Sequence, residues 1–92
     1  MNSIMQEEKE CYITRSLNNL HKHHIYGGNG RRELSEKYGC WVWLRADWHT
    51  MSDHGVHFNK ELDRKLKRLC QERFEQERSR EEFIRIFGRS YL

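Results

Sequence analysis

Six of the 92 residues are histidines, and their spacing is the feature of this sequence that points most clearly to chemistry. They fall into three groups along the chain: His21, His23 and His24; His49; and His54 with His57. Neutral imidazole binds zinc and other borderline divalent metals, and it also exchanges a proton near neutral pH. The histidines therefore predict a metal site, with an imidazole beside it that is free to act on a substrate.

The adjacent pair His23-His24 is the centre of this prediction. In an extended strand, successive side chains point to opposite faces, so His21 and His23 share one face and His24 points to the other. The pair would offer one imidazole to a metal and the other to a substrate, while His49 and His57 approach the same point from later segments. Strand register decides which of the paired histidines faces the metal, and the sequence leaves that open.

An alternative interpretation is a set of unrelated surface histidines, since histidine is common at turns. His54, between an aspartate and a glycine, fits this alternative best, and His21 fits it next. Cys40 is a further candidate ligand that could replace one histidine, because thiolate also binds zinc. With Cys11 and Cys70 it makes three widely spaced cysteines. That number and spacing argue against a disulfide framework and against a redox pair, and they indicate a reducing compartment.

Composition narrows the class of protein. Lys plus Arg is 17 and Asp plus Glu is 14, giving a net charge of +3, with 34% charged and 36% hydrophobic residues. The chain has no run of about 18 apolar residues and no apolar leader at its start, so neither a membrane partner nor secretion is expected. We expect one cytoplasmic domain over residues 1–92, with residues 1–10 fraying or capping the fold. Small domains with so thin a core often add a metal.

The elements that must position the histidines can be read from local pattern. Strand-like residues predict a hairpin from 11–14 and 20–26, then a further strand over 40–44. A glycine-rich loop over 27–30 separates them, and short helices are expected over 33–38 and 45–51. Two capped helices follow. The predicted fold class is therefore α+β: a small antiparallel hairpin and strand, plus helices, around one metal site.

Cap residues define the two C-terminal helices. Asn59 is placed to cap a helix that runs to about Arg78, and Ser79 to cap a last helix that Gly88 ends. The longer helix has an apolar stripe at helical spacing and a basic cluster among acidic residues: Arg64, Lys65, Lys67 and Arg68. An ordinary solvated face is favoured there over a DNA-binding stripe. Trp41, Trp43 and Trp48 are candidates for stacking on bases, although the alternation of the strand favours core packing for one of its faces.

Taken in order, a strand, His-His-Ile, a glycine loop with paired arginines, a strand and a histidine on a helix resemble the ββα-metal finger of HNH endonucleases. More narrowly, the sequence is similar to small HNH-like proteins of phages and prophages of Gram-positive bacteria. The matching stretches cover most of the chain from Leu20 onward: His23 to Gly28, Arg31-Arg32 with Ser35 to Gly39, Gly55 to Asn59, and Phe83 to Leu92.

The resemblance implies a role for each matching residue. His24 corresponds to the general base that activates water. His23, His49 and His57 correspond to positions that hold the divalent metal, which is zinc in the protein as isolated, with magnesium or manganese as alternatives in catalysis. Arg31 and Arg32 are placed to hold a phosphate, which suits the fork geometry of the guanidinium.

Two departures accompany the resemblance. The family often has a zinc-binding Cys-x-x-Cys knuckle in its first hairpin, but here Cys11 is followed three residues later by Thr14. The central asparagine that orients the base in the HNH pattern has no clear counterpart.

Two hypotheses follow from this comparison. The first is a metal-dependent endonuclease or nickase that hydrolyses phosphodiester bonds in DNA. The second is a catalytically silent, zinc-stabilised interaction protein that inhibits a host defence nuclease such as a CRISPR effector (an anti-CRISPR).

Overall fold

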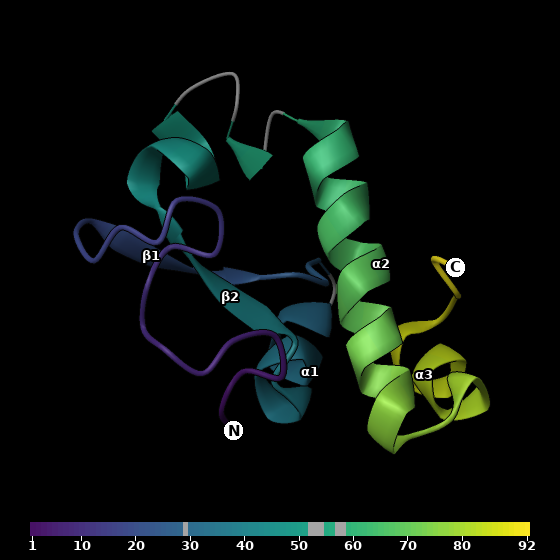
Figure 1. Ribbon diagram of the computed structural model, residues 1–92. Coiled ribbons are helices and arrows are strands. Elements are labelled where there is room, and N and C mark those ends of the chain that lie inside the picture. Colours follow the sequence, from purple (N-terminus) through teal and green to yellow (C-terminus); the bar gives the residue numbers. More distant parts are fainter. Residues whose placement is uncertain (29, 52–54, 57–58) are drawn as a thin grey trace.

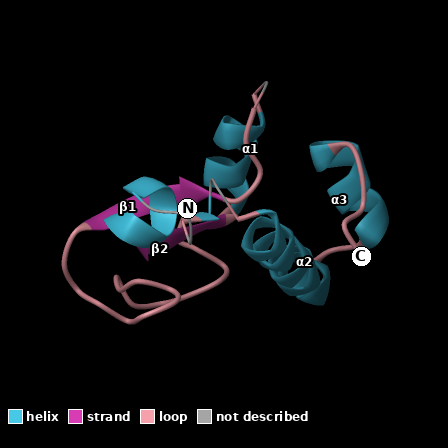
Figure 2. Cartoon of the chain, turned by 90° about the horizontal axis from the view of Figure 1, so that it is seen from above, coloured by secondary structure: helices cyan, strands magenta, loops and turns pink. Residues whose placement is uncertain are grey.

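The computed structural model of this chain describes residues 1–28, 30–51, 55–56 and 59–92. Its elements follow in the order β1 (Leu20–His24), α1 (Arg31–Tyr38), β2 (Trp41–Arg45), the short π-helix η1 (Asp47–Met51), α2 (Lys60–Glu77) and α3 (Arg80–Phe87). The two-stranded sheet lies on one side of α2, and the C-terminal segment lies on the other side (Figure 1 and Figure 2). The coarse α+β class is confirmed. None of the described helices is long and apolar enough to cross a membrane.

The sheet differs from the expected hairpin. β1 and β2 pair antiparallel, with His23 opposite Val42 and His24 opposite Trp41, and α1 connects them. The predicted strand over residues 11–14 is wrong, because this segment is a turn. The N–H of Arg15, a residue with φ 64°, donates to the carbonyl of Cys11 over 2.8 Å, which closes the turn. Of this segment only Cys11 is buried, whereas Ile13 is exposed.

The predicted helix caps are confirmed. The side chain of Asn59 accepts a hydrogen bond from the N–H of Leu62, and that of Ser79 accepts one from the N–H of Glu82, both over 3.1 Å. Each bond satisfies a backbone donor that the first turn of a helix leaves without a partner. Gly88 ends α3 in the left-handed conformation, with φ 91°.

An aromatic cluster joins the sheet to the helices. Tyr26, which follows β1, lies with its ring centroid 4.5 Å from that of Phe87 and 5.3 Å from that of Phe83. Phe74 brings α2 to the same cluster, with its ring centroid 5.3 Å from that of Phe83. All four rings are buried. Burying one such side chain contributes about 1.5–3 kcal/mol, so this cluster is a principal source of stability.

Residues 1–10, expected to fray or to cap the fold, run along the outer edge of β2. The side chain of Gln6 accepts a hydrogen bond from the N–H of Trp43 over 2.6 Å, and the N–H of Ile4 donates to the carbonyl of Gly39 over 2.9 Å. Met5 is buried. The segment thus covers a strand edge that would otherwise expose backbone donors and acceptors. Its close approach also explains Gly39, where the backbone of Asn2 leaves no room for a Cβ.

Candidate metal centre and general base

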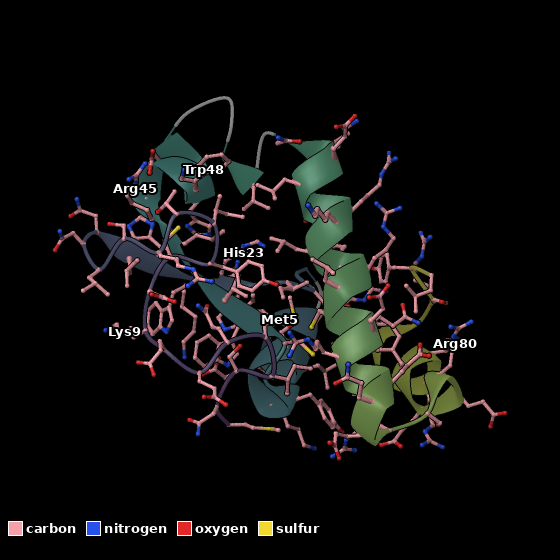
Figure 3. The ribbon with its side chains drawn as sticks, in the orientation of Figure 1. Met5, Lys9, His23, Arg45, Trp48 and Arg80 are labelled. Carbon is pink, nitrogen blue, oxygen red and sulfur yellow. The ribbon has the colours of Figure 1, made fainter. Side chains whose placement is uncertain are left out.

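Three histidines from two elements come together at one end of the sheet. β1 presents His21 and His23 on the same face, as the strand alternation predicts, and η1 brings His49 to them. The Nδ1 atoms of His21 and His49 are 3.2 Å apart. The ring centroid of His49 lies 5.3 Å from that of His21 and 5.3 Å from that of His23. Figure 3 labels His23 on β1 and Trp48 on η1, the two elements that build this cluster.

The position of η1 follows from the end of β2. The guanidinium of Arg45 donates to both carboxylate oxygens of Asp47, from Nε over 2.6 Å and from Nη2 over 2.8 Å. The N–H of Ala46 donates to the carbonyl of Asn19, just before β1, over 2.8 Å. The chain therefore leaves β2 in a fixed direction and turns back over β1, which places His49 above the strand that carries the other two histidines.

The 3.2 Å separation of His21 Nδ1 from His49 Nδ1 has two chemical meanings. In one, a neutral imidazole donates its Nδ1–H to the lone pair of the other ring. In the other, both nitrogens are lone-pair donors to a single ion. Two nitrogens bound about 2.05 Å from a tetrahedral zinc lie about 3.3 Å apart, so the observed spacing fits the edge of such a site. The pair is consistent with zinc without requiring it.

A pocket of about 280 Å³ opens beside this cluster, at the edge of β1. Its walls are Lys22, His23, His24, Gly27, Arg32 and His49. Four of these six residues were singled out from the sequence. His23 is buried, whereas His24 retains a side-chain exposure of 21%. The pocket is thus lined by two imidazoles of the cluster, His23 and His49, together with the imidazole of His24, the ammonium of Lys22 and the guanidinium of Arg32.

His24 is held by a carboxylate from α1. Its Nε2 lies 2.9 Å from Oε2 of Glu36, whose other oxygen accepts a hydrogen bond from the ammonium of Lys22 over 2.9 Å. Hydrogen bonds from Lys22 and from His24 lower the pKa of Glu36, so its carboxylate is ionised at neutral pH and only accepts. Nε2 must then carry the proton, and the basic atom of a neutral His24 is Nδ1.

A buried serine fixes α1 against β1. The hydroxyl of Ser35 donates to the carbonyl of Tyr26 over 2.7 Å and accepts from the N–H of the same residue over 3.1 Å. The carbonyl of Ser35 also accepts from the N–H of Cys40 over 2.7 Å. These bonds fix the position of α1 along β1. In that position Glu36 contacts His24, and Arg32 lines the pocket.

Other predicted site residues lie elsewhere. Arg31 is not among the walls of this pocket; its guanidinium lies at the end of α3, with Nη2 3.2 Å from the position that a Cβ on Gly88 would take. Cys40 is fully buried, with its thiol beside the carbonyl of Tyr38 and the thiol of Cys70. The hydrogen bond between the thiols of Cys40 and Cys70, together with burial, raises the pKa of Cys70. Cys40 therefore belongs to the core of the protein. His57 lies outside the described residues, as does His54. Within the described part of the chain, no group of three or more His, Cys, Asp or Glu side chains is arranged to hold a metal ion.

Two residues near the site are absent from the ligand and base set that the sequence predicts. The strand alternation predicts that His21 shares the face of His23, but His21 also fits the interpretation of a surface histidine and is not in that set. Glu36 carried no signal of its own, because its contact with His24 depends on how α1 folds back on β1. Its carboxylate is the hydrogen-bond partner of the His24 ring.

The tryptophans of β2 have other partners. Trp41 and Trp43 lie on one face of the strand, and the ammonium of Lys22 is 4.1 Å from the ring centroid of Trp41. The ammonium of Lys9 is 4.6 Å from that of Trp43. Such cation–π contacts cover aromatic faces that a base would need.

No protein-family model, curated protein or solved structure matches this chain. The functional argument therefore starts from the geometry of its own residues and from the order of its motifs.

Proposed function

We propose that this chain is a divalent-metal-binding protein of HNH-like type whose histidine pocket hydrolyses phosphodiester bonds in DNA, in the cytoplasm of a bacterial host. One observation carries the proposal. A single pocket combines His23 and His49 with Arg32 and with His24, whose proton position is fixed by Glu36. Metal ligands, base and phosphate-binding group are the three parts that metal-assisted hydrolysis of a phosphodiester needs.

The metal would be held by the histidines that converge at the end of the sheet. His21 and His49 supply two Nδ1 atoms at a suitable separation, His23 is the third candidate, and the resemblance adds His57. When bound, a divalent metal stabilises the charge that develops on the phosphate and on the leaving 3′ oxygen. Zinc suits an imidazole set best, and magnesium or manganese are the alternatives in catalysis.

His24 would act as the general base. Glu36 accepts the Nε2–H, so the lone pair of Nδ1 is the atom that takes a proton from the attacking water. The ionised carboxylate also stabilises the imidazolium that results, in the way that a carboxylate supports a catalytic histidine elsewhere. Arg32 lines the same pocket and would hold a non-bridging phosphate oxygen through its planar fork.

The second candidate function is the zinc-stabilised inhibitor of a host defence nuclease. The turn at Cys11 favours it. The backbone N–H of Thr14 donates to the thiol of Cys11 over 3.4 Å, so hydrogen bonds hold the segment that a zinc knuckle would hold in the family pattern. Burial raises the pKa of Cys11, but hydrogen bonds from Thr14, Ile13 and Arg45 outweigh it and lower that pKa. A protein that has lost the zinc knuckle of the family pattern and still folds can also have lost catalysis.

Plasmid nicking separates the two candidates. The untagged protein is incubated with supercoiled plasmid and magnesium or manganese, beside His24→Ala and the control Lys37→Ala, which alters α1 outside the pocket. Loss of a general base reduces rates by about 10²–10⁴-fold, so His24→Ala should show that loss while bound metal is unchanged. Metal-loaded wild-type protein that does not nick would overturn the enzyme and favour the inhibitor.

A further inference from the structure

A second polar pocket lies on the other side of α2. It has a volume of about 400 Å³ and is formed by the first half of α2 and the C-terminal segment: Lys60, Asp63, Arg64, Lys67, Arg68, Arg89 and Tyr91. Five of these seven residues are cationic and one is anionic, which leaves a formal charge of 5 − 1 = +4. In both views the C-terminal segment lies on the side of α2 away from the sheet that carries the histidines (Figure 1 and Figure 2).

The helical period gathers this charge on one face. Lys60, Arg64, Lys67 and Arg68 stand at positions i, i+4, i+7 and i+8 of α2. Asp63 pairs with Lys67, with 2.9 Å between Oδ2 and Nζ. Arg64 and Arg68 are exposed and line the pocket, so their guanidinium groups are available to an anion.

A buried glutamine holds the C-terminal segment against this face. Gln71 is fully buried in α2, and its side chain accepts from the N–H of Tyr91 over 2.7 Å and donates to the hydroxyl of Ser90 over 2.9 Å. The ring of Tyr91 packs on that of Tyr26, with centroids 5.4 Å apart. The guanidinium of Arg89 lies 4.8 Å from the centroid of the Tyr91 ring. The pocket is therefore built by tertiary contacts and is more than a charged helix face.

We infer that this basic pocket binds the backbone phosphates of a nucleic acid. The choice of DNA as that nucleic acid rests on the proposed function. A net charge of +4 around one small volume favours a ligand with several closely spaced anionic groups. A DNA strand supplies one phosphate per about 3.4 Å, and Arg side chains bind phosphate oxygens in pairs. An acidic protein partner fits less well, because protein interfaces are anchored by buried apolar or aromatic groups, and the one aromatic ring here is covered by cations.

The position of the pocket determines its role. It lies across α2 from the histidine pocket, so it does not touch the reacting phosphate. Its contribution is to affinity: cations that neutralise backbone phosphates release counterions and bind without regard to sequence. DNA binding at this pocket should therefore be independent of metal.

The experiment measures binding of a labelled DNA duplex by fluorescence anisotropy, with the protein as purified and again in EDTA, where no hydrolysis occurs. Circular dichroism of the EDTA sample checks that the protein remains folded without metal. The test variant is the triple Arg64→Gln, Arg68→Gln, Arg89→Gln. The control is the triple Lys65→Gln, Arg73→Gln, Arg85→Gln, which removes the same charge from exposed positions on α2 and α3 outside the pocket. We expect the test variant to bind roughly tenfold or more weakly, and its salt slope to fall by about 0.9 for each phosphate contact removed. The control should stay close to wild type.

Each other outcome overturns the inference. Equal losses in both triples would mean that only net charge matters, and no binding by folded wild-type protein, as purified or in EDTA, would remove the site. Displacement of the duplex by inorganic phosphate at constant ionic strength would assign the pocket to a small phosphate ligand. Displacement by poly-glutamate alone would assign it to an acidic protein. Since the assay contains no free metal, the inference can fail while plasmid nicking succeeds, and the reverse.

Discussion

The two pockets on either side of α2 are built on different physical terms. The histidine pocket, with the adjoining His21, depends on direction: the Nδ1 atoms of His21 and His49 are 3.2 Å apart, and the imidazole of His24 is aligned by a carboxylate at 2.9 Å. The basic pocket has five cationic side chains, and its affinity for phosphates depends on their summed charge. Loss of one ligand or base should therefore abolish the action of the first pocket, whereas loss of one arginine should remove only a share of the action of the second.

Tyr26 connects the two pockets. Its backbone is bonded to Ser35, which fixes α1 at the histidine pocket, and its ring supports Tyr91 at the basic pocket. Its hydroxyl donates to the carbonyl of Lys67 over 2.6 Å, and burial raises its pKa far above the ordinary value, so it stays protonated. The two sites thus share one core while their polar groups remain separate.

The largest expected effect comes from the shared core. Phe83→Ala should lower the free energy of unfolding by about 3–5 kcal/mol, because it removes a fully buried ring from the aromatic cluster. Both pockets should weaken together, in metal binding and in DNA binding. Urea unfolding followed by circular dichroism measures the stability change. The matched control is Ile84→Ala on the same helix, whose side chain is 40% exposed and which should change stability by less than about 0.5 kcal/mol.

A smaller change separates the pockets. Ser35→Ala leaves the backbone groups of Tyr26 without their buried partner and should cost about 1–3 kcal/mol. Because Ser35 sets the position of Glu36 and Arg32, nicking should fall more than this stability loss explains. DNA binding in EDTA should remain near wild type. An equal loss of DNA binding would show that the pockets are not independent.

The smallest effect is a pH dependence of the Glu36 pair. Since the pKa of Glu36 is lowered by Lys22 and then by His24, its contribution to stability is present above the ordinary value of 4.5 and is lost as pH falls through the lowered pKa. Its side chain is 45% exposed, so the contribution should be within about 0–1 kcal/mol. Urea unfolding of wild type and Glu36→Gln from neutral to acid pH should give a difference that shrinks below pH 4.5. A difference that is constant with pH would contradict the assignment.

Local signals in the sequence were sufficient for the helices but not for the sheet. Asn59 and Ser79 cap the helices that they were expected to cap, because a cap depends on residues three positions away. The first predicted strand fails because its β-branched and aromatic residues lie in a turn, where Ile13 is exposed. The turn depends instead on Arg15 in a left-handed conformation, which residue type does not signal.

The site was predictable where it depends on one strand and not where it depends on packing. The alternation of β1 separates His23 from His24 and places His21 on the face of His23, as the sequence predicts. The contact of Glu36 with His24 joins residues 12 positions apart, and the hydrogen bond of Tyr91 with Gln71 of α2 joins residues 20 positions apart. Both depend on tertiary folding. For the same reason, the basic face of α2 was interpreted as an ordinary solvated face: Arg89 and Tyr91 are what convert it into a pocket.

The metal content of the untagged protein, measured by mass spectrometry, tests the central claim most directly. Wild-type protein and His49→Ala are purified in parallel, and the folding of each is checked by circular dichroism. The account predicts about one zinc per wild-type chain and a large loss in the variant, because His49 joins η1 to His21 and His23 of β1. Wild-type protein that contains no metal after incubation with zinc, or a variant that retains the full amount, would contradict it.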